Sequence, residues 1–101
     1  MVKDDFPPAY AFRTALSWSA MRERLNAGTP WPWREGDSAW LGDYLSAHPV
    51  ASGAFRLYEE RGYYVIEMRK NALSRAWHDV VTERLLPLLE ATDIKPNSGF
   101  E

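Results

Sequence analysis

The sequence predicts an α+β fold in which a small antiparallel sheet packs against a C-terminal amphipathic helix. Residues 53–69, GAFRLYEERGYYVIEMR, alternate apolar and polar side chains on both sides of a polar turn, as a β-hairpin does. Residues 73–91 instead repeat apolar side chains at helical spacing. Because a hairpin and a helix that each have one apolar face can bury these faces together, the two segments predict this fold class.

Length and composition indicate a single domain. A chain of 101 residues buries somewhat over about 60% of its unfolded surface, which suffices for one core. We therefore expect one domain over residues 1–101, with the ends 1–8 and 93–101 as flexible tails. The absence of cysteine excludes disulfides and fits a reducing cytoplasm. No apolar run reaches the about 18 residues of a membrane span, and the acidic, proline-containing start is unlike a signal peptide.

Two elements are predicted before the first proline-rich loop. Residues 10–16 alternate in character and indicate an N-terminal strand. A short helix then extends to residue 27, with Ser17 or Ser19 as its N-cap. Its buried stripe would consist of Trp18, Met21 and Leu25.

A second short helix is predicted after that loop. Pro30 and Pro32 hold residues 29–33 in extended geometry, because each proline restricts its own backbone and that of the preceding residue. Asp37 or Ser38 then resembles an N-cap, and a helix follows over residues 39–48. Its apolar face would consist of Trp40, Leu41, Tyr44 and Leu45.

The hairpin has two unlike faces. The face expected to meet the core carries Phe55, Leu57, Tyr64, Ile66 and Met68. The opposite face carries Arg56, Tyr58, Tyr63, Val65, Glu67 and Arg69, and is more apolar than a plain solvated surface. The C-terminal helix has Asn71 or Ser74 as its cap, and Pro87 should kink it or convert its last turn because proline donates no backbone hydrogen bond.

The sequence offers little support for catalysis, a metal or a cofactor. No glycine-rich phosphate loop, zinc-protease helix or calcium loop is present, and without cysteine only His48 and His78 could serve as a nucleophile's base. His78 and Asp79 are chain neighbours, so their spacing alone does not orient them as a pair. Asp43 and His48 are five residues apart, a poor spacing for one helical face. We therefore expect no catalytic residue, no metal and no cofactor.

Charge also argues against nucleic acid and membrane partners. The formal net charge of −2 gives no field that would attract a polyanion to the whole surface. Nucleic acid could bind only through Arg56, Arg61, Arg69 and Lys70, and these cations lie among Glu59, Glu60 and Glu67, which we expect to cancel most of the local basic field.

The segment GTPWPWREGDSAW contains three of the five tryptophans and admits three interpretations. Trp31 and Trp33 could fold back over the core and fix the loop. They could instead form an exposed protein contact with Arg34, Glu35 and Asp37 as its polar rim, since tryptophan and arginine are enriched at interface hot spots. Thirdly, Trp31, Trp33 and Tyr44 could form an aromatic cage for a cationic group.

The preferred prediction is a non-catalytic protein-interaction module, such as a regulator, an inhibitor or immunity-type protein, or an accessory subunit, with a homodimer as one arrangement. Two contact surfaces are predicted, the loop and the hairpin face: Trp31, Trp33, Arg34, Glu35 and Asp37, and Arg56, Tyr58, Tyr63 and Arg69. The alternative is a small enzyme or ligand-binding domain whose pocket would use Trp40, Asp43, Tyr44, His48 and His78. An enzyme needs several of these polar groups to converge in one concave site, whereas a contact module needs only a patch.

Overall fold

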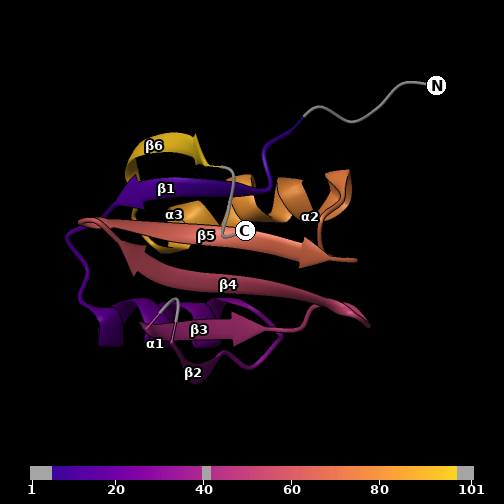
Figure 1. The fold of residues 1–101 in the computed structure, drawn as a ribbon, viewed down its shortest axis with the longest axis horizontal. Coiled ribbons are helices and arrows are strands. Elements are labelled where there is room, and N and C mark those ends of the chain that lie inside the picture. Colours follow the sequence, from indigo (N-terminus) through magenta and orange to yellow (C-terminus); the bar gives the residue numbers. More distant parts are fainter. Residues whose placement is uncertain (1–5, 40–41, 98–101) are drawn as a thin grey trace.

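The computed structural model describes residues 6–39 and 42–97, which form a six-stranded antiparallel sheet with helices on one side of it (Figure 1). The strands lie in the order β2-β3-β4-β5-β1-β6. The predicted α+β class is thus confirmed, whereas the sheet is larger than the expected hairpin with one added strand. The strands are β1 (Ala9–Arg13), β2 (Arg34–Ser38), β3 (Gly42–Ala47), β4 (Gly53–Glu60), β5 (Tyr63–Lys70) and β6 (Thr92–Asn97).

The central hairpin forms as its alternation predicts. Strands β4 and β5 are joined by Arg61 and Gly62, whose φ angles are 52° and 85°. Two successive residues with positive φ are typical of a type I′ turn, whose twist matches that of the two flanking strands. Glycine adopts this conformation without a steric penalty. The register pairs Phe55 with Met68 and Leu57 with Ile66, so the predicted apolar face is the face that enters the core.

The first helix, α1 (Trp18–Gly28), follows its predicted signals closely. Ser17 rather than Ser19 is the N-cap, and its hydroxyl oxygen accepts a hydrogen bond from the Ala20 N–H at 3.1 Å. This bond satisfies one of the backbone donors that a helix start leaves without an intrahelical acceptor. Met21 and Leu25 are fully buried, as the stripe predicts.

The C-terminal helical segment is interrupted before Pro87. It consists of α2 (Arg75–Val80), the π-helical turn η1 (Val81–Leu85) and α3 (Leu86–Leu88), so the predicted helix over residues 73–91 is too long at both ends. Ser74 is the cap, accepting from the Trp77 N–H. The Leu86 N–H donates to the Val81 carbonyl, five residues back. Pro87 lacks an N–H and crowds the preceding turn, which explains why this turn is wider than an α-helical one. The disturbance of the helix at Pro87 is therefore as predicted.

The predicted helix over residues 39–48 is wrong, because this segment contributes to a second hairpin. Strands β2 and β3 pair from Arg34 with Ser46 to Ser38 with Gly42. Gly42 has a φ of 70°, which is left-handed geometry that ends a helix and suits a turn. Within β3 the side chains alternate, and pairing of β3 with β4 satisfies the backbone that the helix would have satisfied internally. Trp40 and Leu41, two of the four residues of the expected apolar face, lie outside the described residues.

Parts of both expected tails belong to the sheet region. Residues 93–97 lie in β6, which pairs with β1 from Ala9 opposite Asn97 to Arg13 opposite Thr92. At the other end, the Pro8 carbonyl accepts a hydrogen bond from the Met68 N–H at 2.8 Å. The N-terminal strand itself is confirmed, over residues 9–13 instead of 10–16. Residues 1–5 and 98–101 lie outside the described residues.

The apolar core lies between the sheet and its helices. Figure 1 shows α1 behind β3 and the C-terminal helical segment behind β1 and β5, all on the same face of the sheet. Burial of this face stabilises the fold by removing apolar surface from water. The buried residues of this core are Phe12, Met21, Leu25, Trp33, Leu45, Ala47, Phe55, Leu57, Ile66, Met68, Ala72, Val81, Leu85, Leu86 and Leu89.

Candidate functional site

The tryptophan loop packs against the core. Trp33 is only 4% exposed, and its ring stacks on Phe55 with centroids 6.2 Å apart. Its indole N–H donates to the Thr29 hydroxyl oxygen at 2.9 Å, and its backbone N–H donates to the Asn26 side-chain oxygen at 2.8 Å. Trp31 lies edge-on to Phe55 and to Trp77. These contacts match the core-covering interpretation of the loop.

The polar residues after the loop lie on β2, an edge strand of the sheet. Arg34, Glu35 and Asp37 are all exposed. Because side chains alternate along β2, Glu35 lies on the helix side of the sheet and Arg34 on the opposite side. The Glu35 carboxylate accepts a hydrogen bond from the Arg22 guanidinium at 3.1 Å. Tyr44 also lies on that opposite side, whereas both tryptophans pack into the core. The three rings of the proposed aromatic cage are therefore not brought together.

The residues of the alternative ligand pocket are spread over the molecule. Asp43 lines a pocket with Trp18, Gly42, Glu59 and Tyr64 at one end of the sheet, and His48 lines another pocket at the far end of β3. His78 is on α2, where its Nε2 and the Tyr10 hydroxyl form a hydrogen bond of 2.6 Å. Trp40 lies outside the described residues. The described members of this set therefore do not form one concave site.

The surface that does bring predicted residues together is the face of the sheet opposite the helices, which we call the outer face. Arg34 on β2 pairs with Ser46 on β3, Ser46 with Arg56 on β4, and Arg56 with Glu67 on β5. Residues paired directly across antiparallel strands share a face, so these four side chains form one row. Tyr44, Tyr58 and Val65 form the next row. Of the two surfaces that the sequence treated as separate, the outer face thus contains the hairpin face and, from the loop surface, Arg34 alone.

Strand alternation divides the three acids of the hairpin between the two faces of the sheet. Glu59 pairs with Tyr64, which packs against the core on the helix side, whereas Glu60 pairs with Tyr63 and lies on the outer face, where it lines a pocket with Arg61. Glu67 is the remaining acid of the three and lies on the outer face, 3.4 Å from the Arg69 guanidinium. Two of the three acids, Glu60 and Glu67, thus lie on the same face as Arg56 and Arg69, and the expected cancellation of the basic field by Glu59, Glu60 and Glu67 stays a prediction.

The centre of the outer face is buried. Ala9, Tyr58 and Val65 form a second apolar cluster, with Ala11 and Tyr44 packed against it. Glu67 is the one buried charged residue in the described part of the chain, at 3% exposure. The Tyr58 hydroxyl is also buried and forms no hydrogen bond with the residues that the structure describes. Burial, and next the negative charge of Glu67, raises the pKa of Tyr58, because both disfavour the phenolate.

A basic pocket lies beside this cluster, where the ends of β3, β4 and β5 meet. Its volume is about 190 Å³. The cationic side chains Arg56, Arg69 and Lys70 line it together with the His48 imidazole. No acidic residue is among its lining residues within the described ranges 6–39 and 42–97. The remaining lining residues are Ser52, Gly53 and Ala54.

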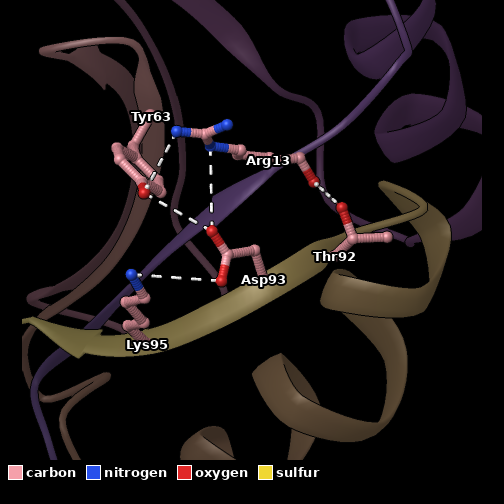
Figure 2. A network of polar contacts seen from close by, with 5 residues as sticks. All are labelled: Arg13, Tyr63, Thr92, Asp93 and Lys95. Atoms are coloured by element: carbon pink, nitrogen blue, oxygen red, sulfur yellow. Dashed lines mark hydrogen bonds and ion pairs between the residues drawn. The ribbon is translucent and has the colours of Figure 1, made fainter.

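At the other end of the outer face a polar network ties β6 to β1 and β5 (Figure 2). Arg13 donates to the Tyr63 hydroxyl at 3.2 Å, and that hydroxyl donates to Asp93 at 3.4 Å. Asp93 is also 3.8 Å from the Arg13 guanidinium and 4.0 Å from the Lys95 ammonium. The Arg13 guanidinium lies 4.5 Å from the Tyr63 ring centre. Tyr63, predicted as a contact residue, thus already has partners within the chain.

Comparison with known proteins assigns no family to this chain. No protein-family model, curated protein or solved structure matches it. Among residues 6–39 and 42–97, no helix is long and apolar enough to cross a membrane. The same residues contain no group of three or more His, Cys, Asp or Glu side chains placed to hold a metal ion.

Sequence reasoning missed the pocket because it placed His48 at the end of a helix. On a helix over residues 39–48, this side chain would not reach the hairpin ends. The signal that could have located it is the alternation in GDYLSA, where Leu45 and Ala47 face the core and Tyr44 and Ser46 face outward. The position of Lys70 beside the pocket could have been predicted from the register of the hairpin, which pairs Lys70 with Gly53.

Proposed function

We propose that this protein is a non-catalytic interaction module of the cytoplasm that binds an acidic segment of a partner protein through the outer face of its sheet. The observation that carries the proposal is the row Arg34–Ser46–Arg56–Glu67 with Arg69 and Lys70 beside it. It concentrates four cations around one buried carboxylate on a chain whose net charge is −2. Such a local field favours association with an oppositely charged surface.

Most of these cations have no acidic partner. Arg34, Arg56 and Lys70 form no ion pair within the described part of the chain, and only Arg69 lies within 4.0 Å of a carboxylate. Arg56 instead lies over the Tyr44 ring, 5.3 Å from its centre. An arginine held against a ring loses less side-chain entropy on binding and presents its planar donors toward a carboxylate. This supports a carboxylate-bearing partner.

The aromatic residues of the outer face favour protein over nucleic acid. Recognition of single-stranded nucleic acid relies on exposed rings on which bases stack. Tyr58 is 2% exposed, Tyr44 is covered by Arg56, and Tyr63 has Arg13 and Lys95 near its ring. None of these three tyrosines therefore offers a free stacking surface.

A homodimer is the second arrangement, and the charge of β2 restricts how it could form. Two β2 strands pairing about a twofold axis would place residues of the same face opposite one another. Glu35 and Asp37 share a face, so such pairing sets acid against acid. Pairing of two β2 edges is thus disfavoured, and sedimentation of the full chain at micromolar concentration tests self-association by any other surface.

The binding experiment uses a fluorescent peptide of alternating glutamate and glycine and follows its anisotropy against the full chain at low ionic strength. The double variant Arg34→Glu/Arg56→Glu should weaken binding by at least about tenfold, since it reverses two charges of the row. The matched control is Arg24→Glu/Arg84→Glu, which reverses the same number of charges at two exposed arginines on the helix side. Added salt should weaken binding to the wild type.

Equal binding by the double variant and the control would contradict the proposal. So would tighter binding of a single-stranded oligonucleotide than of the acidic peptide, which would indicate a nucleic-acid partner. The far-ultraviolet spectrum and thermal midpoint of each variant show whether a loss of binding reflects a loss of fold.

A further inference from the structure

We infer that the basic pocket at the ends of β3, β4 and β5 is an oxyanion site that takes one carboxylate or phosphate group, held by Arg56, Arg69 and Lys70. The inference deepens the proposed function, because it names where on the outer face the anionic group of the partner binds. It rests on that proposal only for the source of the anion, since the pocket can be tested with a free ion.

The charges of the pocket leave it in need of an anion. Arg56, Arg69 and Lys70 line it, and Arg69 forms an ion pair of 3.4 Å with Glu67. One of the three cations therefore has a carboxylate partner among the described residues, and that carboxylate is 4% exposed. Bringing a second anion among them relieves the repulsion between the cations and adds charge-assisted hydrogen bonds.

The chemistry of the donors fits an oxyanion. Each guanidinium presents a planar set of N–H donors that matches two oxygens of a carboxylate or phosphate, and the lysine ammonium adds a point charge. The His48 Nδ1 lies 3.1 Å from the Gly53 carbonyl oxygen. A carbonyl only accepts, so this nitrogen is the donor and the imidazole is fixed at the rim of the pocket.

The size of the pocket limits the ligand to one group. A volume of about 190 Å³ is below the roughly 300 Å³ at which pockets for whole drug-sized ligands begin. The pocket is therefore large enough for an oxyanion at the end of a side chain, with the remainder of the ligand lying over the outer face.

The test is an NMR titration of the ¹⁵N-labelled full chain, first with inorganic phosphate and then with the glutamate–glycine peptide. Saturable shifts are expected at the amides of residues 52–54 and of Lys70. Lys70→Gln should weaken phosphate binding by about tenfold, since it removes one charge from the site. Arg84→Gln should leave it unchanged, although Arg84 also lines a pocket, together with Arg24, Gly28, Pro87 and Leu88.

Absence of saturable shifts at these amides with phosphate would overturn the inference, as would equal phosphate binding by Lys70→Gln and Arg84→Gln. Lys70 is exposed, so its replacement is not expected to affect folding. Arg56→Gln is a second variant, and a dispersed NMR spectrum must first show that it is folded.

The peptide separates the two proposals. If phosphate binds at the pocket and the peptide does not bind, the oxyanion site stands and the acidic protein partner is contradicted. If the peptide binds through Arg34 but is insensitive to Lys70→Gln and to added phosphate, the interaction face stands and the pocket is contradicted. Competition between phosphate and the peptide supports both.

Discussion

The two faces of the sheet are built by the same strands and hold together in different ways. On β4, Phe55 and Leu57 face the helices, and Arg56 and Tyr58 face outward. The helix side buries a large continuous apolar core, whereas the outer side has a small apolar cluster surrounded by charges. The helix face therefore provides most of the hydrophobic stabilisation, and the outer face carries the charges that the core could not accept.

The helix face is organised around one ring. Phe55 is fully buried and meets Trp33 in a stacked arrangement, with Trp31 and Trp77 edge-on at centroid distances of 5.8 and 6.0 Å. Pairs of this geometry add about 0.5–1.5 kcal/mol each beyond the burial of their area. Two tryptophans of the loop and one of α2 thus pack against a single side chain.

The outer face places polar groups where water is excluded. The buried carboxylate of Glu67 lies 3.4 Å from the half-buried Arg69 guanidinium, and the attraction within such a pair often only offsets the cost of removing its charges from water. The Tyr58 hydroxyl has no hydrogen bond to the described residues. This face therefore costs stability that a purely structural surface would not, which fits a surface shaped for binding.

The largest expected effect compares the two buried rings of β4. Phe55→Ala should lower the free energy of unfolding by about 3–5 kcal/mol, because it leaves a cavity among three indoles that cannot close. Tyr58→Ala should cost less, about 2 kcal/mol, because solvent can enter from the outer side and an unpaired hydroxyl is removed. Urea unfolding of both variants measures the difference, and equal losses would show that the outer cluster is packed as tightly as the core.

A smaller effect of opposite sign is expected for Tyr58→Phe. Removing a buried hydroxyl that has no hydrogen-bond partner among the described residues should stabilise the protein by about 1 kcal/mol. Urea unfolding at neutral pH measures this gain. A loss of stability would mean that the hydroxyl has an acceptor.

The same substitution should change the stability at high pH. Burial raises the pKa of Tyr58 above its ordinary value of 10.0, so the folded chain keeps a proton that the unfolded chain loses. The contribution of this protonated hydroxyl to the free energy of unfolding is fully present below pH 10.0. It is lost as the pH rises from there through the pKa of Tyr58 in the folded chain, by at most about 1.4 kcal/mol per pH unit. Tyr58→Phe should therefore show a shallower decline than the wild type. Identical slopes would contradict the shifted pKa.

The smallest effect is expected for the network of Figure 2. Asp93→Asn removes the ion pairs with Arg13 and Lys95, whose side chains are 60% and 59% exposed. Exposed pairs contribute little, so the loss should be about 0.5 kcal/mol at low salt and smaller at high salt. Asparagine also tolerates the φ of 50° at this position, which keeps the backbone unstrained. A loss comparable to that of Phe55→Ala would mean that β6 holds the sheet together.

Much of the fold could be predicted from local patterns, and the failures have a common cause. The hairpin of β4 and β5 and the helix capped by Ser17 have signals within a few residues of one another. The segment 39–48 has an apolar spacing compatible with a helix, and only the neighbouring β4 decides that it becomes a strand. The basic pocket depends on the same pairing, because His48 follows β3 and lines the pocket together with residues of β4 and β5.

The sequence alone determined the α+β class, the central hairpin, the start of α1 and the disturbance before Pro87, because each follows from side chains that act on their own backbone. Only the tertiary structure decided the second hairpin, the pairing of β6 with β1 and the gathering of cations on the outer face. These depend on which strands become neighbours, and hydrogen bonds between strands distant in sequence are not specified by any local pattern.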